Sequence, residues 1–351
     1  MIKKILCVGL VLADILVSPV DTHALREDST CVAPPVVTTG GDALNQAVVL
    51  KRLGVDCAIG CALGADFWGS YIASRLREVG LWTEWVKTVP DLPTSTSVIL
   101  IEPSGERHFL VTPGATQTYA LWPEEQLLQF DIISIGSLWG LSGFTLERIE
   151  TLGRFARAAG IRLAADLTQD LNGMGRDYLR HSLRWIDYFF PSYIEGIALT
   201  GEREPRRILD ALATLGPRHV VLKLGAEGCL ALVDGNVYAQ PSLANVVVDT
   251  TGAGDNLVAA YLACVARNLP APQALRIASL ASAHCIAKIG ATTARYTFED
   301  LSLLLITRTR KQQDAFHFPL APSKTGRTPQ VWKAKSSLHA LNPRQPSGSS
   351  S

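Results

Sequence analysis

The sequence predicts an α/β domain built on a mostly parallel sheet that helices cover on both faces. Short apolar runs alternate with amphipathic stretches of helical length along most of the chain. Strands with few polar positions are typical of a sheet that is buried on both sides. Hydrophobic residues make up 47% of the 351 residues and charged residues 19%, which supplies a large core and excludes a disordered chain.

The order of the elements follows from these runs. The first strand is expected at 5–11, and a helix at 43–53 and a strand at 56–62 come next. The remaining elements are expected as a helix at 68–79, a strand at 132–135, a helix at 145–159, strands at 161–165 and 188–190, a helix at 206–215, strands at 219–224 and 246–248, and helices at 253–267 and 272–288.

The N-terminus fits two interpretations. Lys3 and Lys4 before the apolar run 5–13 imitate a secretory signal, with Thr-His-Ala at 22–24 as its cleavage site. A first buried strand has the same composition and also accounts for Gly9 and Asp14, so the strand is favoured. No run approaches the ~20 apolar residues that span a bilayer, and no membrane association is expected.

The cysteines indicate a reducing compartment. Their number is seven and their spacing is irregular, which is typical of free thiols and predicts a cytoplasmic protein. Cys57 and Cys61 are the closest pair, but no second Cys or His pair with zinc spacing accompanies them. Two half-buried thiols near a strand are the better interpretation.

Two stretches break the α/β rhythm and predict a lid. Residues 14–37 and 95–111 alternate as β-strands do, without helices between them, and Ser104-Gly105 reads as a turn. We expect a small antiparallel sheet that stands off the main one.

Beyond about residue 306 the periodicity stops. Residues 307–351 contain eight Lys and Arg against one acid, and they are predicted to be a disordered tail after a folded domain at 1–306. The chain before this tail has 25 basic and 31 acidic residues, a net charge of −6. This charge gives no general basic surface for nucleic acid.

The strongest chemical signal is the segment Asp249-Thr-Thr-Gly-Ala-Gly-Asp255, which is expected to begin a helix near Ala253. Glycines 252 and 254 let the backbone approach an anion, and the free N–H groups of a helix start then point at it. Asp255 can accept a proton from an alcohol that attacks a phosphoryl group. A glycine turn capped by an aspartate is the alternative that these residues alone leave open.

A second glycine-rich segment lies far upstream. Gly40-Gly41-Asp42-Ala43-Leu44-Asn45 precedes the expected helix, so that Asp42 and Asn45 lie on its first turn. Paired glycines expose backbone N–H groups to a ligand. Taken alone, the segment also fits a capped helix start.

Both segments, in this order, resemble the ribokinase-like (PfkB-type) carbohydrate kinases. That family has Gly-Gly-x-x-x-Asn early, Gly-x-x-Gly-x-Asp-x-x-Gly next and Asp-Thr-x-Gly-Ala-Gly-Asp late, and the matching residues here are 40–45, a variant at 60–69, and 249–255. Weaker landmarks fall in order at 105–107, 113–115, 199–201 and 224–228. The resemblance covers about residues 3–295. It implies an ATP-dependent kinase with a three-layer α/β/α sandwich, a mostly parallel central sheet and a small β-sheet lid.

The resemblance also implies roles for single residues. Asp255 matches the general base, and the backbone of Gly252, Ala253 and Gly254 matches the anion hole. The residues that match the sugar-binding positions are Asp14, which is expected at the exit of the first strand, Gly40, Gly41 and Asn45. The expected partner is thus a sugar or sugar-like small molecule, and a homodimer through the lid edges is a further expectation.

The nucleotide side is implied in the same way. Gly225 and Gly228 match the turn beside ATP, and Glu195 matches the acid of the Asn-x-x-Glu motif that is tied to Mg²⁺. Asp249 and Thr251 fall where some members bind a monovalent cation such as K⁺.

Two departures bear on the acceptor and the metal. Ser192 stands where the family has the Asn of its Asn-x-x-Glu motif. Asp42 follows the paired glycines where ribokinase often has a basic residue, and the Gly-Gly-Asp-x-Leu-Asn run is similar to that of 2-keto-3-deoxygluconate kinases. Sugars, nucleosides and sugar acids therefore stay open as acceptors.

Other classes of protein fit less well. Gly140-Leu-Ser-Gly-Phe144 misses the Gly-x-Ser-x-Gly spacing of serine hydrolases, and the seven histidines form no zinc-protease pattern. A non-catalytic sugar- or nucleotide-binding protein on the same scaffold is the alternative of another class. It is disfavoured because Asp255 and the glycine loop are both intact.

Overall fold

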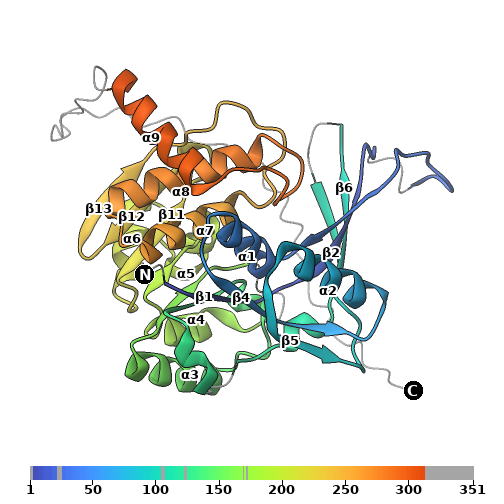
Figure 1. Cartoon of the computed structure of the whole chain (residues 1–351), viewed down its shortest axis with the longest axis horizontal. Coiled ribbons are helices and arrows are strands. Elements are labelled where there is room, and N and C mark those ends of the chain that lie inside the picture. The colour runs from blue at the N-terminus through green and yellow to red at the C-terminus, as the bar shows by residue number, and fades with distance from the viewer. Residues whose placement is uncertain are drawn as a thin grey trace, which may run out of the picture. The chain divides into compact units, whose positions relative to one another are not determined.

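The main sheet confirms the predicted α/β class (Figure 1). The computed structural model describes residues 3–21, 26–103, 107–121, 125–168, 170 and 173–312. In this part of the chain the sheet has nine strands, in the order β13-β12-β11-β10-β9-β8-β1-β4-β5. The strands from β11 to β5 pair in parallel, and β12 and β13 add an antiparallel hairpin at one edge. Their bounds are β1 Ile5–Val8, β4 Cys57–Gly64, β5 Trp82–Val89, β8 Ile132–Ile135, β9 Arg162–Ala165, β10 Tyr188–Phe189, β11 His219–Lys223, β12 Cys229–Val233 and β13 Asn236–Gln240.

Two hydrophobic cores, one on each face of this sheet, make the three predicted layers. In β1, Ile5 and Cys7 belong to one core and Leu6 and Val8 to the other, and all four are fully buried. Residues of α1 Asp42–Arg52, α2 Phe67–Val79, α7 Ala253–Ala266, α8 Ala271–Ile286 and α9 Phe298–Gln312 build the first core. Residues of α3 Leu146–Ala159, α4 Gly175–Leu183, α5 Tyr193–Thr200 and α6 Pro205–Ala213 build the second.

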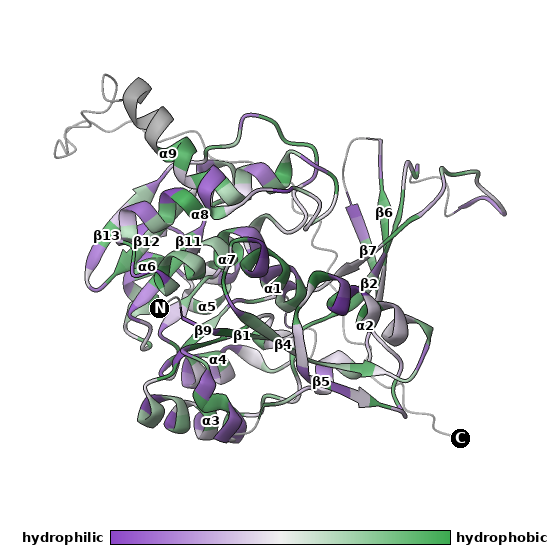
Figure 2. Cartoon of the chain, in the orientation of Figure 1, coloured by the Kyte–Doolittle hydropathy of each residue, from purple (hydrophilic) through white to green (hydrophobic). Residues whose placement is uncertain are grey.

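The hydropathy of the elements agrees with this layering. Figure 2 shows apolar residues concentrated along β1 and β4 in the centre, while the covering helices carry polar residues on their outer sides. Within the described ranges, no helix is both long and apolar enough to cross a membrane.

The first strand is shorter than predicted, and Asp14 therefore lies on a different strand from the expected one. β1 ends at Val8, because Gly9 takes a positive φ of 152° and a Cβ there would lie 2.5 Å from the carbonyl oxygen of Gly136. The chain then enters a second sheet, so Asp14 lies within β2 Leu12–Val17 and not at the exit of the first main-sheet strand.

The second sheet occupies the predicted lid region and has the order β3-β2-β6-β7. Its strands are β2, β3 Val36–Gly40, β6 Thr96–Ile101 and β7 Arg107–Thr112. The prediction of an antiparallel sheet was wrong for its central pair, because β2 and β6 run in parallel with Ile15 opposite Val98. The predicted turn at 104–105 lies outside the described residues.

Other expectations differ from the structure in definite places. Residues 246–248 form no strand, and their three valine side chains are exposed. The elements β5, β12, β13, α4, α5 and α9 were not expected. Helix α9 extends through Gln312, past the predicted start of the tail, and the rest of that predicted tail, 313–351, lies outside the described residues.

The topology shows where a ligand would bind. From β1 the sheet grows to β4 and β5 on one side and to β8 and the later strands on the other, so β1 marks the point where the strand order reverses. In open parallel sheets, ligands bind outside the carboxyl ends of the strands at such a point.

Candidate active site

Helix α7 begins where the late motif predicts. Gly252 is its N-cap residue with a left-handed φ of 74°, and a Cβ at this position would lie 2.3 Å from the Cβ of Ala291. The N–H groups of the first turn, where Gly254 and Asp255 lie, have no partners within the helix and carry the positive end of its dipole. This geometry suits an anion at the mouth of the helix.

Asp255 and Asn45 meet at this helix mouth, although 210 positions separate them in the sequence. The Asn45 side-chain amide donates a hydrogen bond of 2.7 Å to Oδ2 of Asp255. Burial raises the pKa of Asp255, while the Asn45 hydrogen bond and the charge of Lys223 act in the opposite direction. A carboxylate with a raised pKa is a stronger proton acceptor, so the arrangement suits a general base.

A second carboxyl group, Asp42, lies in the same region on the first turn of α1. Its Oδ2 accepts a hydrogen bond from the Ser137 hydroxyl, and its Oδ1 accepts one of 3.0 Å from the backbone N–H of Ala43. Burial and the charge of Asp255 raise the pKa of Asp42 well above its usual range. We therefore expect Asp42 to favour its protonated form when Asp255 is ionised.

Asp14 lies against Gly40, the first of the paired glycines. A Cβ on Gly40 would lie 2.0 Å from Oδ2 of Asp14, and one on Gly41 would lie 2.2 Å from the carbonyl oxygen of Leu10. Asp14 is 9% exposed, and burial raises its pKa to about 7. A buried carboxylate of this kind needs hydrogen-bond donors, which the hydroxyls of a polyol can supply.

A cavity of about 620 Å³ lies beside the start of α7. Gly225, Gly228 and Gly254 line it, together with Ser192 and Lys223. Gly228 permits a close approach there, because a Cβ on it would lie 2.1 Å from the carbonyl oxygen of Gln240. The two glycines that were predicted for ATP thus share one cavity with Gly254 on the first turn of α7.

Lys223 and Asp166 are functional candidates that the sequence analysis missed. Lys223 ends β11 and Asp166 follows β9, so both stand at the carboxyl edge of the sheet, with Nζ 2.7 Å from Oδ1 of Asp166. A Cβ on Gly254 would lie 3.2 Å from Nζ of Lys223, which places the ammonium beside the first turn of α7. A polar residue at the end of an apolar strand is the sequence signal that could have identified both Lys223 and Asp166.

The charges at this edge influence one another. Burial raises the pKa of Asp166 to about 6 although Lys223 lowers it. Burial alone would lower the pKa of Lys223, but the negative charges of Asp166 and Glu195 raise it above its usual value. Glu195 itself accepts a 2.7 Å hydrogen bond from the N–H of Ser192, and the Ser192 hydroxyl accepts from the Glu195 N–H at 3.3 Å. Glu195 and the substituted Ser192 therefore form a capping box at the start of α5.

Asp249 and Thr251, the residues predicted for a monovalent cation, lie together, and the guanidinium of the lid residue Arg107 contacts both of them. Nη1 of Arg107 is 3.0 Å from Oδ1 of Asp249, and the same guanidinium also donates to the hydroxyls of Thr250 and Thr251. The sequence analysis recognised Arg107 only as a landmark of the lid.

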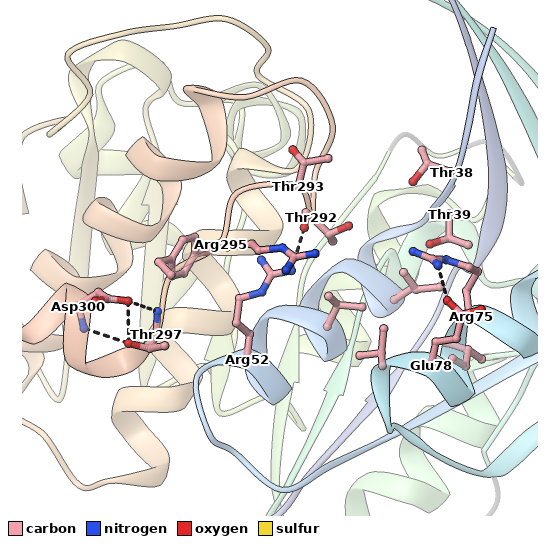
Figure 3. Close-up of a pocket in the computed structure, with 15 residues that line it drawn as sticks. Thr38, Thr39, Arg52, Arg75, Glu78, Thr292, Thr293, Arg295, Thr297 and Asp300 are labelled. Atoms are coloured by element: carbon pink, nitrogen blue, oxygen red, sulfur yellow. Dashed lines mark hydrogen bonds and ion pairs between the residues drawn. The ribbon is translucent and has the colours of Figure 1, made fainter.

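A larger cavity of about 790 Å³ lies between α1, α2 and the segment 292–300 (Figure 3). Arg52 holds the edge of this cavity by donating to the carbonyl of Thr292 at 2.8 Å, and Arg75 pairs with Glu78. No residue that the sequence predicts for catalysis or binding lines this cavity. We therefore assign the chemistry to the smaller cavity beside Gly254.

Comparisons with known proteins identify the family of the chain. The family model described as pfkB family carbohydrate kinase matches residues 2–297. Ribokinase of Arabidopsis thaliana is 28% identical over 261 residues, which are 72% of this chain and 68% of that protein. A 1-phosphofructokinase of Haloferax volcanii is 27% identical over 267 residues, 73% of this chain and 82% of that protein.

Solved structures have the same fold. The structure of Arabidopsis thaliana ribokinase complexed with ribose and ATP superimposes with a TM-score of 0.73 at 23% identity and covers 87% of this chain and 99% of that one. Burkholderia thailandensis nucleoside kinase in complex with inosine gives 0.72 at 22% identity, with 87% and 97% covered.

The chain belongs to the pfkB family of carbohydrate kinases. It is a carbohydrate or nucleoside kinase of the ribokinase type, and thus a phosphotransferase with an alcohol group as acceptor.

Proposed function

We propose that this protein transfers the γ-phosphoryl group of ATP to a hydroxyl group of a sugar or sugar-like small molecule. The hydrogen bond between Asn45 and Asp255 carries the proposal. It joins segment 40–45, to which we assign the acceptor, with segment 249–255, to which we assign the phosphoryl group, at the start of α7. The acceptor lies on the side of Asp14, and ATP lies in the cavity beside Gly225 and Gly228.

The chemistry then follows from the positions of the groups. Asp255 takes the proton of the acceptor hydroxyl while the hydroxyl oxygen forms a bond to the γ-phosphorus. The bond from that phosphorus to the β-phosphate oxygen breaks, and ADP leaves. Backbone N–H groups of the 252–254 segment and the Lys223 ammonium face the phosphoryl oxygens, where they stabilise the negative charge of the transition state.

Mg²⁺ fits this site as an ion that accompanies ATP. Among the described residues, no three His, Cys, Asp or Glu side chains gather as a metal cluster. Mg²⁺ commonly binds through substrate phosphates, waters and one or two carboxylates, and it neutralises phosphate charge. Asp166 and Glu195 are the carboxylates that would face it, each with one oxygen not used by the Lys223 or Ser192 contact.

A panel of acceptors tests the proposal. Hexoses, pentoses, nucleosides and 2-keto-3-deoxygluconate are incubated with ATP and Mg²⁺, and acceptor-dependent ADP release is measured. We expect release with at least one of these polyols and none without an acceptor. Acceptors that raise the melting temperature without ADP release would instead support the non-catalytic sugar- or nucleotide-binding alternative.

Asp14 supplies a prediction that separates acceptor binding from ATP binding. Asp14→Asn is expected to raise the KM for the acceptor about 10- to 100-fold, because a charged hydrogen-bond acceptor is lost. The KM for ATP should change little. In the wild type the acceptor KM should rise as pH falls below about 7, where Asp14 becomes protonated. An unchanged acceptor KM in the variant would place the acceptor elsewhere.

The same variant should be more stable than the wild type at alkaline pH. The folded pKa of Asp14 is about 7, above its usual value of 3.8, so its ionisation opposes folding and stability falls as pH rises from about 4 to 7. Asp14→Asn removes this cost, which corresponds to about 2–4 kcal/mol in the free energy of unfolding at pH 8. Denaturant unfolding at pH 5 and pH 8 measures the difference, which should be less than half as large at pH 5 and should vanish only below the unfolded pKa of 3.8.

We also propose that two copies associate through the lid and that the protein works in the cytoplasm. Val36, Phe109, Leu110 and Val111 on the lid strands are all exposed by 45–57% of their surface, and exposed apolar side chains on one element favour an interface. The cysteines of the described residues are all free, which suits a reducing compartment. Sedimentation of the wild type and of Leu110→Glu tests the association, since the charged variant should be monomeric.

A further inference from the structure

Arg107 joins the lid to the segment 249–255, which we propose for phosphoryl transfer. It is the first residue of β7, and its guanidinium contacts three successive residues of the late motif. Nη1 is 3.0 Å from Oδ1 of Asp249, Nη2 donates to the Thr250 hydroxyl at 2.6 Å, and Nη1 also donates to the Thr251 hydroxyl. The arginine therefore lies directly beside the loop that leads into the anion hole.

The carboxylate of Asp249 is fully engaged in this arrangement. Besides Arg107, its Oδ1 accepts hydrogen bonds from the Thr251 N–H at 2.9 Å and from the Thr251 hydroxyl at 2.6 Å, and its Oδ2 accepts from the Gly290 N–H at 2.8 Å. The Asp249 side chain is only 8% exposed. Donors occupy both oxygens, so Asp249 and Thr251 as they stand do not fit a bound monovalent cation.

The charge of Asp249 is balanced within the protein. Burial alone would raise the pKa of Asp249, but the hydrogen bonds from Thr251 and Gly290 and the charge of Arg107 hold it below its usual range. A guanidinium is always protonated, and its planar fork can hold several acceptors at once. Arg107 is thus a permanent cation in the position where the resemblance to the family implied an exchangeable one.

We propose that the Arg107 guanidinium replaces a bound monovalent cation at Asp249 and positions the loop 249–252 for phosphoryl transfer. The proposal rests on the proposed kinase function. It has two consequences. The enzyme needs no K⁺, and the order of the anion-hole loop depends on a residue that the lid supplies.

Kinetics in three salts test this role. The acceptor is the one that gives the highest rate in the panel, and KCl, NaCl and choline chloride are compared at equal ionic strength. We expect the wild-type rate to be nearly the same in all three. Arg107→Ala should lower kcat/KM about 10- to 100-fold in choline chloride, chiefly through kcat, because a charged hydrogen-bonding group is lost. KCl or millimolar guanidinium should restore part of the loss.

Two further variants control for charge and for folding. Arg75→Ala removes the same charge from an exposed pair with Glu78 and should behave as the wild type in every salt. Arg107→Lys keeps the charge without the fork and should fall between the wild type and Arg107→Ala. Strong activation of the wild type by K⁺, or an Arg107→Ala variant that keeps full activity in choline chloride, would overturn the proposal.

The melting temperature of the ligand-free protein gives a reading that does not depend on turnover. K⁺ or guanidinium should raise the melting temperature of Arg107→Ala and leave that of the wild type unchanged, relative to choline. A wild type that phosphorylates no acceptor would refute the proposed function, while these melting temperatures would still decide whether Arg107 substitutes for a cation. A wild type that is stabilised by K⁺ as much as the variant would refute the substitution alone.

Discussion

Replacing Asp255 by Asn is expected to lower kcat by ~10²–10⁴, the contribution that a general base typically makes. The amide cannot accept the proton of the acceptor hydroxyl. It can still accept the 2.7 Å hydrogen bond from Asn45 through its oxygen, so the geometry of the helix mouth should survive. The melting temperature and the affinity for ATP should therefore stay close to those of the wild type. Steady-state kinetics with saturating ATP and circular dichroism measure these quantities.

Asp42→Asn is the matched control for this variant. It makes the same chemical change in a carboxyl group of the same region, but burial and the charge of Asp255 already favour the protonated form of Asp42. Asn resembles that form, and we expect kcat to change by only a few-fold. Comparable losses in the two variants would mean that general polarity of the site matters and that Asp255 has no special role as base. Full turnover by Asp255→Asn would contradict the mechanism directly.

The sheet could be predicted from the sequence where strands are buried on both faces. The strand at 132–135 was placed correctly because three of the four residues of β8 are isoleucines and all four are buried. The same rule failed at 246–248, where three valines imitate a buried strand. Val247 lines the cavity beside Gly254 instead. The composition of a short apolar run does not distinguish a sheet from the wall of a binding site.

Half-exposed strands were harder to recognise. The edge strand β5 carries Glu84 and Lys87 and buries only Trp85 fully, so it gives no continuous apolar run. The hairpin of β12 and β13 had a clear signal that was overlooked, since Asp234 and Gly235 both adopt positive φ at its turn. An Asp-Gly pair between two β-like runs is among the strongest local signs of a hairpin.

Site residues within one short segment could be predicted from the sequence, whereas contacts between distant segments could not. Gly252 and Asp255 could be predicted because one short segment contains both the helix start and the carboxylate. The hydrogen bond from Asn45 and the clamp of Arg107 depend on contacts across more than a hundred residues, and no spacing in the sequence encodes them. The resemblance to a family brought Asn45 into the site, but it could not show that a lid arginine holds the predicted cation ligand.

Lys223→Met is expected to have the second-largest effect, on both stability and turnover. The Lys223 side chain is 16% exposed and that of Asp166 is 4% exposed, so the variant leaves Asp166 with a buried charge and no cationic partner. Breaking such a pair typically costs about 3–5 kcal/mol in the free energy of unfolding. The loss of a cation beside Gly254 should also lower kcat by ~10²–10³, as the removal of one donor from an oxyanion hole does. Denaturant unfolding and steady-state kinetics measure the two effects.

The double variant Lys223→Met with Asp166→Asn separates these two roles. It replaces both charges, so no unpaired carboxylate remains and most of the stability should return. The site beside Gly254 would still lack its ammonium group, so kcat should stay low. A double variant that regains stability and turnover together would show that Lys223 only neutralises Asp166. A stable protein with a kcat well below that of Asp166→Asn alone would instead place the ammonium at the transferred phosphoryl group, in line with its 3.2 Å distance from a Cβ on Gly254.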